Sequence, residues 1–187
     1  GLVNKGFSCS FSVPATGKFT RFYPQNNTDS IKGSLIIIYA CSKFTIMFKP
    51  KVLFVCTGNS CRSQIAEGIL RDKAGDEFDV YSAGSHPSRV NPMSIRVMNE
   101  WGIDISHHIS DPIDYYLDKG IDIVITVCDN ANQVCPTFPG DAKRLHWSIK
   151  DPFAGWDADD EHLDSFRKTR ETICTRIEEF LHSWKAD

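Results

Sequence analysis

The sequence has no long apolar run and no excess of basic residues. Its longest apolar stretch, LIIIYAC at 35–41, is far too short to cross a bilayer. The 21 Lys and Arg residues face 24 Asp and Glu, for a formal net charge of −3, so charge gives no reason to expect nucleic-acid binding. The sequence also lacks paired Cys-x-x-Cys motifs, so no structural zinc site is expected. We therefore expect a monomer with neither a membrane nor a nucleic-acid partner.

The cysteines are odd in number and widely spaced, and a chain of 187 residues can bury a core without disulfides. A disulfide framework of the kind found in small secreted proteins is therefore not expected. Catalytic or metal-binding use in a reducing compartment fits better, so we expect a cytoplasmic protein. The seven cysteines stand at positions 9, 41, 56, 61, 128, 135 and 174.

Residues 1–46 differ in composition from the rest of the chain. Residues 1–50 hold six basic residues against Asp29 alone, and 1–46 show no sustained apolar period. Three interpretations remain: an upstream extension without a fold, a targeting peptide, or an added edge strand at SLIIIYA. We expect an extension with little order at 1–46, followed by one domain at 47–187.

From residue 50 onward, strand and helix patterns alternate. KVLFV is a continuous apolar run, as in a central parallel strand, and Pro and Gly bracket two of the helical patterns. The alternation predicts an α/β three-layer sandwich around a four-stranded parallel sheet. Strands are expected at 51–55, 78–84, 121–127 and 143–149, and helices at 63–73, 92–101, 112–119 and 160–184.

The segment CTGNSCRS, residues 56–63, joins the first strand to the first helix. Backbone N–H groups in such a loop, together with the positive end of the helix, form an anion site. Arg62 offers a planar fork for an oxyanion, Gly58 is expected to allow a backbone conformation closed to other residues, and the same field favours the nucleophilic thiolate of Cys56. The expected substrate-binding residues are Thr57, Gly58, Asn59, Ser60, Cys61, Arg62 and Ser63.

The motif Cys-x5-Arg-Ser resembles the low-molecular-weight tyrosine phosphatase fold, and CTGNSCRSQIAEG as a whole is similar to the arsenate reductases built on that fold. The resemblance continues through YSAG, GIDIS, DIVITVC, HW and DP and covers roughly residues 50–185. It implies arsenate as the substrate and reduction to arsenite as the reaction. Residues 1–46 lie outside it.

A second pair of thiols, Cys128 and Cys135 in VCDNANQVCP, follows the third predicted strand. Parallel strands end at one edge of the sheet, so this pair is expected on the same side as Cys56. A reductase needs two electrons from thiols, whereas a phosphatase has no use for the pair. The polar segment 129–134 is expected to lack strong structure and to move.

The resemblance assigns a role to each of these groups. Cys56 attacks arsenic, Asp151 protonates the departing oxygen, Cys128 attacks the adduct, and Cys135 then attacks Cys128. The resulting disulfide would be reduced by a thiol donor, and related enzymes use thioredoxin, glutaredoxin with glutathione, or other small thiols. By this resemblance, two thiols spaced seven positions apart favour thioredoxin. The resemblance also implies a potassium ion beside the loop. Its ligands would be Asn59, Glu67, Ser82 and Asp111, and no other cofactor is expected.

Two other functions remain open at this stage. A phosphatase would use Cys56, Arg62 and Asp151, with Phe153 and Trp156 in DPFAGW as a partial aromatic platform. A regulatory thiol sensor would bind an oxyanion without turnover. We expect the histidines at 107 and 108 to be exposed and His146-Trp147 to be a packed, hydrogen-bonded pair.

Overall fold

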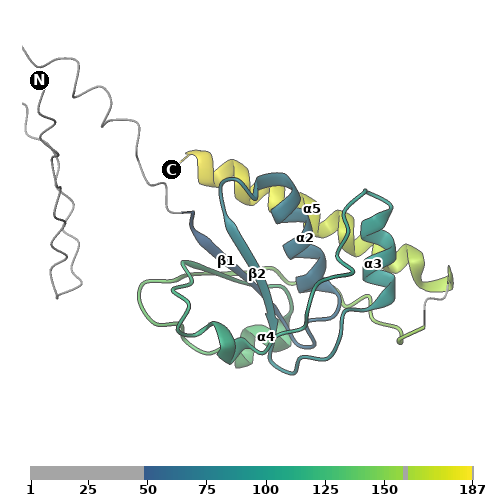
Figure 1. Ribbon diagram of the computed structural model, residues 1–187, viewed down its shortest axis with the longest axis horizontal. Helices are drawn as coiled ribbons and strands as arrows, with labels where there is room; N and C mark the ends of the chain where they lie inside the picture. Colours follow the sequence, from purple (N-terminus) through teal and green to yellow (C-terminus); the bar gives the residue numbers. More distant parts are fainter. Residues whose placement is uncertain (1–48, 158–159, 187) are drawn as a thin grey trace, which may run out of the picture. The chain divides into compact units, whose positions relative to one another are not determined.

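The computed structural model describes residues 49–157 and 160–186 (Figure 1). The predicted extension at 1–46, and the alternative edge strand within it, lie outside the described residues. The start predicted for the domain at residue 47 also lies outside them.

A sheet of four parallel strands forms the centre of the fold. The strands are β1 (Lys51–Cys56), β2 (Asp79–Gly84), β3 (Ile123–Thr126) and β4 (Lys143–His146), in the order β2-β1-β3-β4. Residues 52–56 of β1 are all buried, as expected for a strand covered on both faces. The α/β fold with four parallel strands is therefore confirmed.

Helices cover both faces of the sheet. Figure 1 shows α2 (Arg62–Ala74), α3 (Pro92–Asn99) and α5 (Leu163–Ala186) together on one side and α4 (Asp129–Val134) on the other. Two short 3-10 helices, η1 (Ile113–Tyr116) and η2 (Asp160–His162), complete the described elements. Helix α3 begins as predicted at Pro92, and the Asn91 side chain caps it by accepting a bond from the Met93 N–H.

Two of the predicted elements were wrong. Residues 129–134, expected to be unstructured, form α4, because the Cys128 thiol caps its first turn and Ala131 packs into the core. The helix predicted at 112–119 shrinks to η1, in which Ile113 and Tyr116 are the buried residues. The packing of Ala131 is a tertiary contact that the helix sequence does not show, and Cys is not among the residues usually expected at a helix N-cap.

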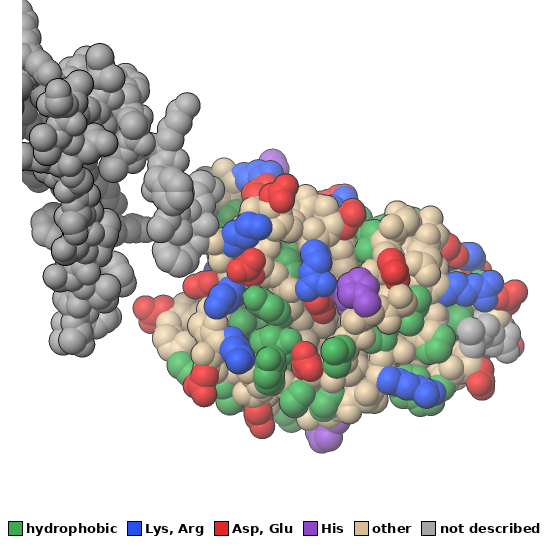
Figure 2. All heavy atoms as spheres, viewed as in Figure 1, with side chains coloured by type: hydrophobic (Ala, Val, Ile, Leu, Met, Phe, Trp, Pro, Cys, Tyr) green, Lys and Arg blue, Asp and Glu red, His purple; other side chains and the backbone are tan. Residues whose placement is uncertain are grey.

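The core includes side chains from β1, β3 and the long helix α5, and α2 packs against both β1 and α5. The largest fully buried side chains include Phe54, Ile125 and Phe166, and Phe54 packs on Trp147 with ring centroids 5.8 Å apart. The face presented in Figure 2 carries basic, acidic and apolar side chains interspersed, in keeping with the small net charge. Among the described residues, no helix combines the length and the apolar character needed to cross a membrane.

Candidate active site

The candidate nucleophile, Cys56, ends β1 in the middle of the sheet. Its Sγ lies 3.0 Å from Ser63 Oγ on the first turn of α2, and only 2% of the residue is exposed. The strand places the sulfur at the carboxyl edge of the sheet, and the loop at 57–61 turns directly over it. Cys56 therefore lies where ligands bind in sheets of this kind.

The loop bends at Asn59, which has a positive φ of 44°. Its Nδ2 donates to Ser63 Oγ and Ser82 Oγ, each at 2.8 Å, and its Oδ1 accepts from the Asp111 N–H at 2.9 Å. The prediction that Gly58 takes the special conformation was therefore wrong. Asn tolerates the left-handed region better than most residues, and here three hydrogen bonds hold it there.

Arg62 and Asp151 form an ion pair across the site. The guanidinium donates to Asp151 Oδ2 at 2.6 Å and to the Ile149 carbonyl at 2.9 Å. The side chain of Arg62 is 10% exposed and that of Asp151 is 52% exposed. Sequence reasoning placed the two residues at the same edge of the sheet, but it did not foresee that the acid would pair with the arginine.

A cavity of about 220 Å³ opens over the loop. Phe153 and Trp156 form part of its wall, with ring centroids 5.2 Å apart. Ser88, which sequence reasoning missed, also lines it and donates to the Gly58 carbonyl at 3.1 Å. Its place shortly after β2, the neighbour of β1, was a signal that could have found it. The lining residues are Cys56, Thr57, Gly58, Ser60, Cys61, Arg62, Ser88, Asp151, Phe153 and Trp156.

The second thiol pair brackets α4. Cys128 follows β3, which pairs with β1, and its Sγ lies 3.5 Å from Oγ1 of Thr57. Its sulfur also accepts from the Ala131 N–H at 3.4 Å and so caps α4. Cys135 ends the helix and is 8% exposed, and burial raises the pKa of its thiol. The structure thus brings Cys128 against the Cys56 loop and holds Cys135 at the far end of α4.

Cys61 is a loop residue with a different environment. Burial, the main cause, raises the pKa of its thiol to about 11. Such a thiol stays protonated near neutral pH, where the thiolate is the reactive form. Cys61 therefore contributes to the loop as a small buried residue and is a poor nucleophile.

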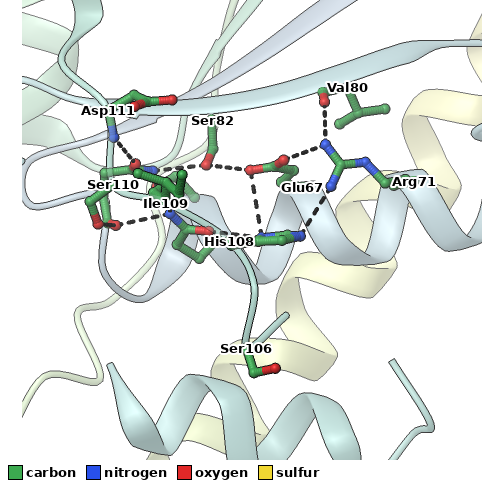
Figure 3. A network of polar contacts seen from close by, with 12 residues as sticks. Glu67, Arg71, Val80, Ser82, Ser106, His108, Ile109, Ser110 and Asp111 are labelled. Carbon is green, nitrogen blue, oxygen red and sulfur yellow. Dashed lines mark hydrogen bonds and ion pairs between the residues drawn. The ribbon is translucent and has the colours of Figure 1, made fainter. Parts of the chain in front are cut away.

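The four residues expected to hold a cation lie in one hydrogen-bonded cluster that includes loop residue Asn59. Figure 3 shows Glu67, Ser82 and Asp111 of this cluster. Asn59 donates to Ser82 Oγ, and Ser82 in turn donates to Glu67 Oε2 at 2.6 Å. Asp111 joins through its N–H to Asn59 and accepts from Tyr116 OH at 2.9 Å. Burial raises the pKa of Glu67. In the described part of the chain, no group of three or more His, Cys, Asp or Glu residues is arranged for a metal ion.

His108 borders this cluster, and the prediction that it is exposed was wrong. Its side chain is 5% exposed, and its Nδ1 lies 2.9 Å from Gln64 Oε1 while its Nε2 lies 3.0 Å from Arg71 Nη1 (Figure 3). Gln64 donates through Nε2 to the Asn59 and Ile109 carbonyls. His108 is therefore tied to the loop through Gln64, which sequence reasoning also missed because neither residue belongs to the loop motif.

His146 and Trp147 form the packed, hydrogen-bonded pair that was expected. Trp147 packs on Phe54, and His146 lies within hydrogen-bond distance of Thr126 Oγ1 and Asp129 Oδ1. This pair joins β4 to the core and to the first turn of α4. It does not line the cavity over Cys56.

Comparison with known proteins places this geometry in a family. Residues 51–187 match the model of the low molecular weight phosphotyrosine protein phosphatase family. The chain belongs to this family. The match spans β1, the Cys56 loop and α5, and residues 1–50 lie outside it.

Within the family, the chain is similar to arsenate reductases and to phosphatases. An arsenate reductase of Halalkalibacterium halodurans is 45% identical over 139 residues, which are 74% of this chain and 100% of that protein. A solved thioredoxin-dependent arsenate reductase of Corynebacterium glutamicum is 32% identical with a TM-score of 0.59, covering 79% of this chain and 67% of that one. A solved low molecular weight protein tyrosine phosphatase from T. tengcongensis is 27% identical with a TM-score of 0.61, and the match covers 72% of this chain and 99% of that one.

Proposed function

We propose that this chain reduces arsenate to arsenite by passing electrons through Cys56, Cys128 and Cys135. The observation that carries the proposal is the position of Cys128, whose sulfur lies against Thr57 in the loop that holds Cys56. The similarity to arsenate reductases at up to 45% identity over nearly three quarters of the chain supports the same reaction. A phosphatase would need Cys56 as its only thiol and would have no use for Cys128 or Cys135.

In the first step the cavity binds arsenate and Cys56 attacks it. The N–H groups of the loop and the Arg62 guanidinium supply donors for the oxyanion. The Cys56 thiolate forms a sulfur–arsenic bond, and one arsenate oxygen leaves as water after Asp151 protonates it. In the structure the Arg62 guanidinium is paired with the Asp151 carboxylate. This ion pair must break before Arg62 can bind arsenate and Asp151 can donate a proton.

In the second step arsenic takes two electrons. The Cys128 thiolate attacks the Cys56 sulfur, a disulfide forms between them, and the electron pair of the broken sulfur–arsenic bond leaves with arsenite. Cys135 then attacks Cys128, which frees Cys56 as a thiolate and leaves a Cys128–Cys135 disulfide. A dithiol protein reduces that disulfide, and the thioredoxin-dependent relative supports thioredoxin in this role.

Helix α4 must unwind before the last disulfide can form. A helix rises 1.5 Å per residue, so Cys128 and Cys135 stand about 10 Å apart along its axis. A disulfide needs Cα atoms within about 7 Å of each other. The helix lies between the two thiols, so it must open before Cys135 can reach Cys128.

We also propose that the hydrogen-bonded cluster around Asn59 binds potassium. Asn59, Glu67, Ser82 and Asp111 supply oxygens, which suit a hard cation, and Glu67 is a buried carboxylate that a cation would stabilise. The ion would add positive charge beside the oxyanion loop. Thermal unfolding in KCl against NaCl tests this, and we expect potassium to raise the melting temperature of the parent but not of Glu67→Gln.

A phosphatase is the second candidate, and a specific observation favours it. Phe153 and Trp156 both line the cavity, where they could stack against the ring of a phosphotyrosine. Cys56, Arg62 and Asp151 would then serve as nucleophile, anion clamp and acid.

One assay separates the two functions. NADPH consumption is followed with arsenate, thioredoxin and thioredoxin reductase, for the parent and for Cys56→Ser, Cys128→Ser and Cys135→Ser. We expect each change to abolish multiple turnover, because each removes one link of the relay. Cys174→Ser, on α5 and away from the cavity, is the matched control and should match the parent.

The same proteins are then assayed on an aryl phosphate. If the parent consumes no NADPH, while the parent, Cys128→Ser and Cys135→Ser all hydrolyse the aryl phosphate rapidly, the phosphatase is the function. Rapid NADPH consumption that survives Cys128→Ser would exclude the relay.

A further inference from the structure

Helix α4 is held at its last turn by a residue of the neighbouring strand β4. Arg144 donates through Nη2 to the carbonyl and to Oδ1 of Asn132, the latter at 3.1 Å, and through Nη1 to the Cys135 carbonyl at 3.3 Å. Carbonyls in the last turn of a helix lack hydrogen-bond partners within the helix. A cation at this end also interacts favourably with the negative end of the helix dipole. One guanidinium therefore supplies the C-terminal cap of α4.

The other end of α4 is capped by a thiol that the proposed reaction consumes. Cys128 Sγ accepts from the Ala131 N–H in the reduced protein. Once Cys128 is bonded to Cys56, its sulfur is drawn toward the loop and is a weaker acceptor. A helix of six residues has little stability of its own, so its persistence then depends on the contacts at its last turn.

Resting on the proposed function, we propose that Arg144 is a positioning residue that keeps α4 wound in the reduced protein. In this role it keeps Cys135 buried and apart from Cys128 until arsenate has reacted. Cys135 is 8% exposed although it lies at a helix end, and its own backbone carbonyl accepts from Arg144. Without this contact the last turn of α4 would open, and Cys135 would be exposed to solvent before substrate arrives.

The test measures how fast N-ethylmaleimide alkylates Cys135 in the reduced full chain, by peptide mass spectrometry. Arg144→Gln should raise the rate by about tenfold, since bonds to a charged donor hold α4 closed. Arg144→Lys, which keeps the charge but not the fork, should fall between Arg144→Gln and the parent. Lys143→Gln removes the neighbouring exposed cation of β4 and should leave the rate within about twofold of the parent, because α4 keeps its cap.

A second readout separates a local from a general effect. Inorganic phosphate should protect Cys56 from the same reagent equally in the parent and in Arg144→Gln, because Arg144 does not line the cavity over Cys56. If that protection is lost, Arg144→Lys decides between the outcomes. A Cys135 rate in Arg144→Lys above that of Lys143→Gln supports the proposal.

If phosphate protection is intact in Arg144→Gln, the proposal is overturned when Cys135 of that variant is alkylated no faster than Cys135 of Lys143→Gln. If protection is lost, the same comparison is made with Arg144→Lys. Neither readout requires turnover. If the parent fails to reduce arsenate, the proposed function is wrong. The Cys135 alkylation rates still test the role of Arg144 independently.

Discussion

Asn59 is the residue on which the shape of the oxyanion loop depends. It is fully buried, it takes a left-handed backbone conformation, and its side chain joins Ser63, Ser82 and the Asp111 backbone. Glycine at this position would tolerate the backbone angle but would lose the side-chain hydrogen bonds. Alanine would lose the same bonds and would also be strained at this angle. The two substitutions therefore separate backbone strain from side-chain bonding.

We predict that Asn59→Gly destabilises the fold by about 1–3 kcal/mol through its lost hydrogen bonds. Asn59→Ala should cost about 1 kcal/mol more, because a Cβ without hydrogen bonds is strained in this region. Urea unfolding of the two variants measures the difference. A glycine variant no more stable than the alanine variant would show that the backbone angle carries no strain.

Burial keeps His108 neutral, and its two neighbours fix which ring nitrogen carries the proton. Arg71 can only donate, so Nε2 of His108 accepts and Nδ1 carries the proton toward Gln64 Oε1. Burial, reinforced by the Arg71 charge, lowers the pKa of His108 from 6.5 to about 4. The unfolded chain therefore binds a proton between pH 6.5 and 4 that the folded chain does not.

We predict that this proton difference makes stability fall with acid. The contribution of neutral His108 is complete above pH 6.5 and is lost as the pH falls toward 4, with a slope of at most about 1.4 kcal/mol per pH unit. Urea unfolding at several pH values should show that the unfolding free energy depends less steeply on pH in His108→Gln than in His107→Gln. The second variant is the control, because His107 is exposed in the parent. Equal slopes in the two variants would contradict the assignment.

At this scale, sequence reasoning found the residues whose chemistry is written in a local motif. Cys56, Arg62 and Ser63 lie within eight positions and gather at one edge as expected. It missed the bend at Asn59 and the burial of His108, because both are set by partners more than twenty positions away in sequence. Spacing along the chain carries no record of those partners.

Among the elements, β2 presses on the loop at its last residue, Gly84. A Cβ built there would lie 2.7 Å from the Thr57 carbonyl oxygen and 2.8 Å from the Asn59 nitrogen. Both are backbone atoms and cannot move aside alone. At Gly58, by contrast, a Cβ would meet only the Ser60 and Ser88 side chains, no closer than 3.3 Å.

We predict that Gly84→Ala destabilises the fold by about 1–3 kcal/mol, as overpacking does, and weakens the binding of inorganic phosphate. Gly58→Ala should cost less than about 1 kcal/mol, because its neighbours can adjust. Calorimetric unfolding with and without phosphate measures both effects. Equal costs for the two variants would mean that β2 does not fix the loop.

The elements that sequence reasoning recovered best are the long ones with a clear period, such as α2, α5 and β1. It failed at α4, whose six residues are mostly polar, because the helix draws on the Cys128 thiol, the Arg144 guanidinium and the burial of Ala131. Of these, the Arg144 contact comes from β4, and the Cys128 cap uses a residue type that is not a usual N-cap.

For the whole molecule, the strand order decides which groups meet. Because β1 lies between β2 and β3, the loops after all three strands converge on Cys56. The alternation of strands and helices predicted the parallel sheet and this common edge. It could not predict the pairing of Arg62 with Asp151, because that contact spans 89 positions and depends on where the segment after β4 folds back.

The central claim is that electrons pass through three thiols in a fixed order, and mapping disulfides after one turnover tests it most directly. The reduced chain is mixed with one equivalent of arsenate and no reductant, then alkylated and digested for mass spectrometry. We predict a Cys128–Cys135 disulfide in the parent, a Cys56–Cys128 disulfide in Cys135→Ser, and one arsenite released in each. Arsenite release with Cys128 still free, or a disulfide that leaves out Cys128, would contradict the account.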